Sequence, residues 1–297
     1  MAADKEWQGR TDGTPWMHRW LIRVMRVLPL RLMYAGVAVF VVPFYMLFRR
    51  SGFRAQWQFF RQRMGYGRWR SFWSTYRNHC QFSQVVLDRF YMFAGGRFRL
   101  DIDNMELYNH LAARPEGFVI LSSHVGCYEV AGYTLQANDK RFNALVFGGE
   151  AEAVLENRRR VMEANNIHTI VTSDDMSHVF LISEALANGE VVSIPGDRIY
   201  GSPKNVSCRF FDAQAHFPLG PFALAAQRSL PALQVSVMKE GYKHYHVHIN
   251  NITQDIDMTL PIRQRAAIMA QRFADGLETI VRRYPTQWYN YFDFWVS

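Results

Sequence analysis

The sequence predicts an α/β protein in which a mostly parallel sheet is flanked by helices and preceded by N-terminal hydrophobic and amphipathic helices. From about residue 98, short apolar runs alternate with segments of helical periodicity, an order typical of a parallel sheet with helices on both faces. An uncharged apolar stretch at residues 32–48 precedes this alternation. We therefore divide the chain into a membrane-associating helical region, residues 1–95, and an α/β core, residues 96–297.

The composition indicates a protein that works at a membrane surface. The net charge of +8 comes mostly from arginine, and many of the arginines and tryptophans lie in the first 70 residues. Arginine and tryptophan beside an apolar segment are typical of membrane interfaces. RNA could also attract such a surface, but the chain has no pattern of a nucleic-acid-binding module, so we expect no nucleic acid. Three cysteines without metal-type spacing predict reduced thiols in a cytosol-facing protein.

The N-terminal region contains two segments that suit a bilayer. Residues 16–28 form a basic amphipathic segment, after a polar start without the order of a signal peptide. The apolar run 32–48 is at the short end of what spans a bilayer, and Pro43 would kink it. We expect a hydrophobic hairpin or interfacial anchor, and the alternative is a buried helix of a soluble core. Residues 54–93 are expected to be helical, with arginines that face solvent or headgroups.

The α/β core is expected to contain five strands of one sheet and a hairpin strand at its edge. The strands are predicted at 118–121, 143–147, 168–171, 191–194 and 233–238, and the edge strand at 242–249. Helices are predicted near 128–136, 151–164, 176–187, 221–228 and 262–284.

His124 follows the first of these strands, so we expect it at the carboxyl end of the strand, just before a helix. Ligands of open α/β sheets bind at this edge. Glu129 lies in the first turn of the expected helix, where its carboxylate can reach one imidazole nitrogen if the turn folds back. Such a pair is a base able to take a proton from an alcohol or an amine. The alternative is a capped histidine in a strand–helix turn. Cys127, three residues from His124, is interpreted as a small apolar filler and not as a nucleophile.

Two further stretches carry groups that could bind a substrate. Asp197 and Arg198 follow the strand 191–194, on the same sheet edge as His124 if the sheet is parallel. Asp197 can orient Arg198, which could hold an anionic or carbonyl group, and a structural ion pair is the alternative. The turn 217–222 runs into a helix, where amides beginning at Gly220 could contribute to an oxyanion or anion site.

Three histidines, His244, His246 and His248, alternate along the predicted edge strand and therefore share one face. Three imidazoles on one face could bind a metal ion. No carboxylate or cysteine lies near them in the sequence to complete a site. We therefore interpret the histidines as the polar face of an edge strand and predict no metal and no cofactor.

Taken in order, these segments resemble the lysophospholipid acyltransferase superfamily, in particular its branch of bacterial lipid A late acyltransferases. A less characterised branch, which includes predicted acyltransferases of aryl-polyene lipid clusters, is also similar. The resemblance runs over nearly the whole chain, from about Trp16 to Trp295. Its motifs are His-x4-Glu at 124–129, Gly-Asp-Arg at 196–198, Phe-Pro-x-Gly-Pro at 217–221, Tyr-Pro-x-Gln-Trp at 284–288 and Tyr-Phe-Asp-Phe-Trp at 291–295. The aromatic tail itself is interpreted as packing against the core or the bilayer.

The resemblance implies an acyltransferase on the cytoplasmic face of the inner membrane. His124 would be the general base and Glu129 its orienting partner, while backbone amides or Arg198 stabilise the oxyanion. An acceptor hydroxyl or amine would attack the thioester of acyl carrier protein or acyl-coenzyme A directly. The positive charge of the chain suits acidic acyl carrier protein as well as anionic lipid.

One departure from the superfamily's motif limits the range of acceptor substrates. Glycerol-phosphate acyltransferases carry a glutamate where this chain has Leu219, and Pro221-Phe222 replace the residues that follow. This argues against glycerol-3-phosphate or lysophosphatidic acid and leaves lipid A precursors, an aminolipid or another amphipathic acceptor. The alternatives are a hydrolase of acyl thioesters or lysolipids and a non-catalytic lipid or carrier-protein binding module.

Overall fold

The computed structural model describes residues 15–48, 50–130, 135, 140–148, 159, 162–163, 166–173, 175–199 and 204–295. Its helical elements are α1 (Pro15–Met25), α2 (Leu30–Gly36), the π-helical η1 (Val37–Val41), α3 (Val42–Phe48), α4 (Arg50–Gln58), the π-helical η2 (Phe59–Arg63), α5 (Arg68–Phe93), α6 (Met105–Ala112), α9 (Ser177–Ala187), α10 (Leu219–Arg228), α11 (Ile262–Arg283) and the 3₁₀ turn η3 (Pro285–Gln287). The strands are β1 (Arg99–Ile102), β2 (Phe118–Ser122), β3 (Phe142–Val146), β4 (Ile167–Val171), β5 (Val191–Pro195), β6 (Asn205–Phe210), β7 (Ala213–Pro218), β8 (Ala232–Gly241) and β9 (His244–Asn251).

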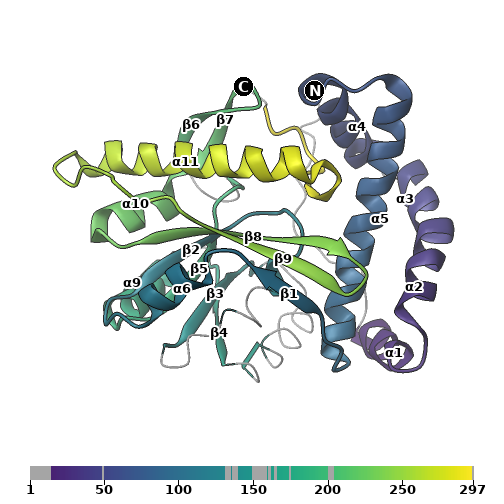
Figure 1. The fold of residues 1–297 in the computed structure, drawn as a ribbon, viewed down its shortest axis with the longest axis horizontal. Coiled ribbons are helices and arrows are strands. Elements are labelled where there is room, and N and C mark those ends of the chain that lie inside the picture. The colour runs from purple at the N-terminus through teal and green to yellow at the C-terminus, as the bar shows by residue number, and fades with distance from the viewer. Residues whose placement is uncertain are drawn as a thin grey trace.

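A seven-stranded sheet forms the centre of the molecule, in the order β1-β9-β8-β2-β5-β3-β4 (Figure 1). Strands β8, β2, β5, β3 and β4 run parallel, whereas β9 runs antiparallel to β8, and β1 follows the direction of β9. One face of the sheet shares an apolar core with α9, α10 and α11, and the other shares a core with α6. The predicted α/β fold with a mostly parallel sheet is therefore confirmed.

The prediction that the hairpin strand forms an edge of the sheet is wrong. β9 is the second strand of the sheet, because β1 pairs with it in parallel, with Asp101 opposite His246. β1 is not predicted from the sequence, because it has only four residues, none of them fully buried, and so lacks a clear apolar pattern. The helices predicted at 128–136 and 151–164 lie mostly outside the described residues. The other predicted strands and helices of the core agree with observed elements within a few residues.

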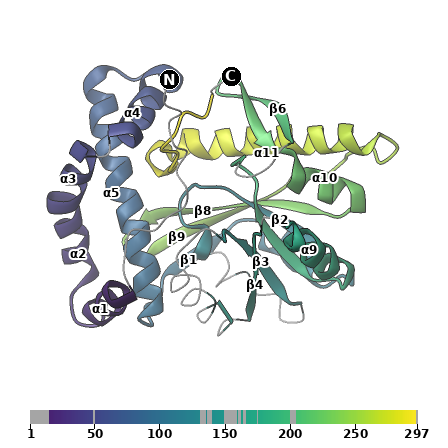
Figure 2. The same ribbon diagram turned by 180° about the vertical axis from the view of Figure 1, so that it is seen from behind.

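The N-terminal helices form a layer at one side of the sheet. Helix α5 lies next to the sheet, and α2 and α3 lie on the side of α5 that faces away from it (Figures 1 and 2). The stretch Leu30–Phe48 is long and apolar enough to cross a membrane, and 11% of its most apolar window is buried. A helix of a soluble core would be mostly buried, so its exposure does not fit that alternative. The last of these helices ends at Phe93 and the first strand begins at Arg99.

Pro43 accounts for the irregular backbone in the middle of this apolar stretch. In the π-helical turn, the N–H of Val42 donates to the carbonyl of Val37, five residues back. The same pattern would pair the carbonyl of Ala38 with residue 43, but proline has no N–H to donate. The hydroxyl of Tyr76, on α5, donates to this carbonyl instead, at 2.9 Å. Tyr76 thereby joins the apolar stretch to α5.

Replacing Tyr76 with phenylalanine should therefore lower the free energy of unfolding by ~1–2 kcal/mol, because the Ala38 carbonyl loses its donor in an apolar setting. Thermal or denaturant unfolding in detergent measures the change. Tyr242→Phe is the matched control, since the Tyr242 ring packs against Arg31 but its hydroxyl makes no hydrogen bond with the described residues. An equal loss in the two variants would contradict the special role of Tyr76.

Candidate active site

The ends of two neighbouring strands bring His124 and Asp197 together. β2 and β5 pair in parallel with Ser122 opposite Pro195, where both strands end. His124 lies two residues beyond Ser122, and Asp197 lies two residues beyond Pro195. The amide of Gly196 donates to the carbonyl of Ser122 at 2.8 Å and continues the ladder toward the two side chains. The parallel register alone therefore places the two residues side by side at the carboxyl edge of the sheet.

Asp197 holds His124 through both of its carboxylate oxygens. Oδ1 lies 2.8 Å from Nδ1 of the imidazole, and Oδ2 accepts the backbone N–H of His124 at 2.7 Å. The carboxylate selects the tautomer with a proton on Nδ1, which leaves the lone pair on Nε2. The Asp197 side chain is 2% exposed and that of His124 is 25% exposed. Among the described residues Nε2 has no hydrogen-bond partner, so the imidazole presents a basic nitrogen to a substrate.

The structure corrects the expected partner of the imidazole. Nδ1 of His124 is bonded to Asp197, whereas Oε1 of Glu129 accepts from the guanidinium of Arg89 at 3.0 Å. Glu129 is buried, and Arg89 reaches it from α5, so this ion pair connects the N-terminal helical layer to the turn that follows His124. The sequence did not indicate Arg89, because it is one of many arginines in the region 54–93.

Burial and charge set the protonation states at this edge. Burial and the nearby Arg198 guanidinium lower the pKa of His124 below its usual 6.5, although Asp197 opposes them. The imidazole is therefore neutral near pH 7. Burial alone would raise the pKa of Asp197, but His124 and Arg198 hold it below its usual range, so the carboxylate is ionised.

Arg198 and Tyr128 lie beside this pair. The guanidinium of Arg198 donates to the carbonyl of Tyr289 at 3.0 Å and lies 5.7 Å from the ring centre of Phe292. The ring of Tyr128 packs edge-on against the imidazole of His124, with 6.1 Å between the ring centroids. A cation and an aromatic ring thus flank the basic nitrogen. Asp197 bonds to His124 in addition to its electrostatic attraction to Arg198, so it does more than orient the guanidinium.

The C-terminal segment is built into the active-site loop. Val125 and Trp288 form an antiparallel bridge, the amide of Tyr289 donates to the carbonyl of His124 at 3.0 Å, and the amide of Gly126 donates to the carbonyl of Gln287 at 2.9 Å. The aromatic tail does pack on the core, as expected, but its backbone also fixes the position of His124. Sequence reasoning missed this pairing, because aromatic side chains indicate packing and carry no information about backbone partners.

Two buried side-chain amides of the helical layer form hydrogen bonds with the backbone of this C-terminal segment. The Gln56 side chain donates to the carbonyls of Trp288 and Asn290 at 2.9 and 2.8 Å. The Asn78 side chain donates to the same Trp288 carbonyl at 2.8 Å. Both amides are fully buried. The N-terminal helices, the tail and the His124 loop are therefore one packed unit.

Gly126 makes the close approach of the loop to β8 possible. Its φ of +54° is in the left-handed region, and a Cβ there would lie 1.9 Å from the carbonyl oxygen of Val237. The amide of Cys127 donates to that carbonyl at 2.8 Å. Cys127 itself is buried, and burial raises the pKa of its thiol to about 12. A thiol with this pKa is neutral at pH 7, which agrees with its interpretation as an apolar filler.

Gly220 is the second residue of α10 and is exposed. Because α10 leads into β8, which is parallel to β2, the start of α10 lies toward the carboxyl edge of the parallel strands. The structure brings His124, Asp197 and Arg198 together. No hydrogen bond connects Gly220 with His124 among the described residues, so the role of the Gly220 amide stays a prediction.

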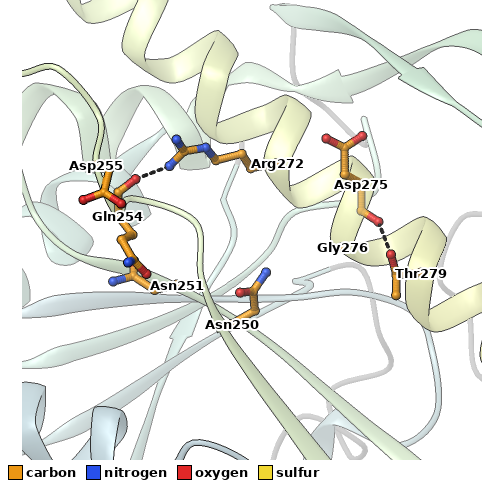
Figure 3. A pocket seen from close by; sticks show the side chains of 8 residues that line it. All are labelled: Asn250, Asn251, Gln254, Asp255, Arg272, Asp275, Gly276 and Thr279. Atoms are coloured by element: carbon orange, nitrogen blue, oxygen red, sulfur yellow. Dashed lines mark hydrogen bonds between the residues drawn. The ribbon is translucent and has the colours of Figure 1, made fainter.

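An open cleft lies away from this site, between the end of β9 and α11 (Figure 3). Its volume is about 450 Å³, and its lining includes Asn250, Asp255 and Arg272. Arg272 donates to the backbone carbonyl of Gln254, and the Thr279 hydroxyl donates to that of Asp275. Since β9 is antiparallel to β8 and therefore to β2, its end lies at the opposite edge of the sheet from His124. A polar lining at that edge does not suit an acyl chain.

Comparisons with known proteins identify the family. The family described as bacterial lipid A biosynthesis acyltransferase matches residues 96–295, about two thirds of the chain. No curated protein gives a significant sequence match. Among solved structures, the 1-acyl-sn-glycerophosphate (LPA) acyltransferase PlsC from Thermotoga maritima is similar at 10% identity with a TM-score of 0.37, over 89% of this chain and 98% of that chain. Because the matched region includes the strand ends with His124 and Asp197 and the tail beside them, the chain belongs to the bacterial lipid A biosynthesis acyltransferase family and is a lipid acyltransferase.

Proposed function

We propose that the protein transfers a fatty acyl group from the thioester of acyl carrier protein or acyl-coenzyme A to a hydroxyl or amine of a lipid acceptor, such as a lipid A precursor or a lysolipid. The observation that carries this proposal is the neutral, accessible imidazole of His124, held by a buried carboxylate at the carboxyl edge of the sheet. Such a group can take a proton from an acceptor at neutral pH.

The proposed reaction begins when Nε2 of His124 removes the proton of the acceptor hydroxyl or amine as that group attacks the thioester carbonyl. The resulting imidazolium is stabilised by Asp197 through Nδ1–H. The tetrahedral oxyanion is stabilised by the Arg198 cation and by backbone amides, among which we include Gly220 at the start of α10. The carbon–sulfur bond then breaks, and the imidazolium returns its proton to the departing thiolate. No acyl-enzyme forms in this scheme.

Glu129 has a positioning role in the proposed site. Its ion pair with Arg89 fixes the turn after His124 against α5. Arg89 is therefore included with the predicted residues His124, Glu129, Asp197 and Arg198.

We also propose that the N-terminal layer lies in the cytoplasmic leaflet of the inner membrane. Phe40, Phe44 and Phe48 are 76, 62 and 69% exposed. Helix α3, which contains Phe44 and Phe48, lies on the side of α5 away from the sheet (Figure 2). Trp69 and Trp73 at the start of α5 are also exposed, and aromatic residues of this kind favour the headgroup region. The apolar stretch packs along α5, which itself contacts the active-site loop, so membrane binding would bring His124 near its lipid acceptor.

Replacing Phe40 and Phe44 with serine should weaken binding to vesicles of phosphatidylglycerol and phosphatidylethanolamine by ~10-fold or more, since each change removes a large apolar side chain from the interface. Co-sedimentation with the vesicles measures binding. The matched control is Phe180→Ser, at an equally exposed phenylalanine (78%) on α9. If the control weakens binding as much, the membrane-facing surface is not the N-terminal layer.

The reaction is tested with purified protein in mild detergent, given labelled acyl carrier protein and a total bacterial lipid extract. The wild type should produce a labelled lipid that His124→Ala does not, and the mass of that lipid identifies the acceptor. Labelled free fatty acid alone, again dependent on His124, would replace the proposal with a hydrolase. Equal signals from the two proteins would leave the non-catalytic binding module. Repeating the assay with labelled acyl-coenzyme A distinguishes the two donors.

A further inference from the structure

Asp103, His246 and His248 form a cluster of metal-ligating groups that has no part in the proposed reaction. We propose that these three residues bind a divalent transition-metal ion of the zinc class, which connects β1 to β9 and stabilises this side of the sheet.

The sheet register creates the cluster. His246 and His248 are two residues apart on β9, so their side chains leave the same face, and their rings stack with 4.2 Å between centroids. The alternate residues of β9, Tyr245 and Val247, point to the other face of the sheet and are fully buried. In the parallel pairing of β1 with β9, Ile102 lies opposite Val247, which places Asp103 next to His248. The carboxylate of the cluster is therefore supplied by Asp103, in the connection after β1, which is distant from the histidines in the sequence.

Three ligand atoms converge in this cluster. Oδ1 of Asp103 lies 2.8 Å from Nε2 of His246, and Oδ2 lies 2.8 Å from Nδ1 of His248. All the ligand atoms lie within 4.8 Å of one another. Tetrahedral zinc with bonds of 2.0–2.2 Å holds its ligand atoms ~3.3 Å apart. A ligand pair farther apart than this, up to the 4.8 Å limit, would move closer on binding, and the two Asp103–histidine separations need an opening of about half an ångström. The Asp103 side chain is 49% exposed and can rotate to provide it.

The orientation of His246 is a second observation in favour of an ion. Its Nε2 atom is buried and makes no well-directed hydrogen bond with the described residues, although the Asp103 oxygen is 2.8 Å away. A buried imidazole nitrogen without a directed partner is costly, and a metal ion on its lone pair would satisfy it. Two imidazoles and a carboxylate are a ligand set that zinc, nickel and copper accept.

Glu240 on β8, Arg283 at the end of α11 and Tyr284 just after it complete the surroundings of the cluster. Glu240 lies 3.4 Å from Nδ1 of His246 and accepts a hydrogen bond from the Tyr284 hydroxyl at 2.6 Å. The same hydroxyl lies 3.4 Å from Nε2 of His248, and Arg283 lies 3.6 Å from Glu240. Two carboxylates against one guanidinium leave a net negative charge when the histidines are neutral, which favours a cation. Glu240 orients His246 from outside the ligand set, as carboxylates commonly do at zinc sites.

The cluster could instead be a set of ordinary His–Asp ion pairs, and one neighbouring pair provides the control. His244 lies on the same face of β9, with Nε2 2.8 Å from Asp101. It has an imidazole and a carboxylate at the same distance, but it is not part of the three-residue cluster. Loss of His244 therefore removes a comparable ion pair without removing a proposed ligand.

The test uses tag-free, full-length protein that has been treated with EDTA and then titrated with Zn²⁺ by calorimetry and with Co²⁺ by visible absorption. We expect the wild type to bind one equivalent at the cluster, with Co²⁺ bands typical of nitrogen and oxygen ligands. His246→Asn and His248→Asn should each weaken binding by ~10–100-fold, and His244→Asn by less than threefold. At saturating Zn²⁺ the wild type should gain ~5 °C in Tm, and the two variants should not.

Three results would overturn the proposal. The first is no binding by the wild type at a concentration where structural zinc sites are filled. The second is binding that survives in both His246→Asn and His248→Asn, which would place the ion elsewhere on the chain. The third is an equal loss in His244→Asn. Because His124 and Asp197 are outside the cluster, these outcomes are independent of the acyltransferase reaction.

Discussion

Replacing His124 with asparagine should lower kcat for acyl transfer by ~10²–10⁴-fold, the range in which positioned general bases contribute to catalysis. Asparagine keeps a polar side chain beside Asp197 but has no lone pair that can accept the acceptor's proton. The unassisted attack of an alcohol on the thioester would then set the rate. The KM for the acyl donor should change little, because the imidazole acts on the acceptor. Initial rates of labelled lipid formation at several concentrations of donor and acceptor separate these two constants.

His244→Asn is the control for this substitution, since His244 also pairs with an aspartate at 2.8 Å but lies at the start of β9, which β8 separates from β2. It should retain wild-type kcat. Comparable Tm values for the two variants would establish that the loss in His124→Asn is chemical. A kcat within a few-fold of the wild type for His124→Asn would exclude His124 as the base.

The Asp197→Asn variant should lose ~10²–10⁴-fold in kcat and should also shift the pH profile. The carboxylate selects the Nδ1–H tautomer and stabilises the imidazolium, and an amide of the same shape does neither. In the wild type, kcat/KM should fall as the pH decreases through the pKa of His124, which burial and Arg198 hold below 6.5. Asp197 raises that pKa, so without its charge the pKa decreases further. The acidic limb of the profile should therefore move to lower pH.

The shift distinguishes an electrostatic role of Asp197 from a structural one. A variant that only loosened the loop would lose activity equally at every pH. The matched control is Asp101→Asn, which removes the carboxylate from the His244 pair on β1 and should leave kcat and the acidic limb unchanged. An unshifted limb in Asp197→Asn would contradict the electrostatic coupling between Asp197 and His124.

The sequence predicts an element well where its buried apolar residues form a continuous run or recur with the period of a helix. The strand at Phe118–Ser122 is completely buried and reads as an apolar run, and α11 has a continuous apolar stripe on its 22 residues. β1, β6 and β7 are not predicted. β1 and β7 do not alternate regularly between exposed and buried positions, whereas β6 does alternate, with Val206, Cys208 and Phe210 turned inward, a signal that sequence reasoning missed. The mistaken edge position of β9 follows directly from the missing β1.

The sequence indicates which residues form the candidate site, but it does not indicate most of the contacts between them. His124, Asp197 and Arg198 are recognised because chemically active residues follow strands. The bond between His124 and Asp197 depends on the register of β2 against β5, which no local pattern contains. Glu129 is nearer to His124 in the sequence than Asp197 is, so local spacing favours Glu129 as the partner of the imidazole. Arg89 and the backbone of Tyr289 reach the site from distant segments, and such contacts become visible only when the chain is folded.

The pairing of the tail with the His124 loop has a consequence for the order in which the protein becomes active. The loop at residues 124–126 is bonded to residues 287–289, which the ribosome adds about 160 residues later. Contacts of such long sequence separation form late in folding, because a large loop must close first. The strands of the sheet are made before residues 287–289, but the imidazole loop of His124 acquires its final backbone partners only after those residues have been added. A nascent chain that has not reached residue 289 thus lacks the complete loop of the proposed site.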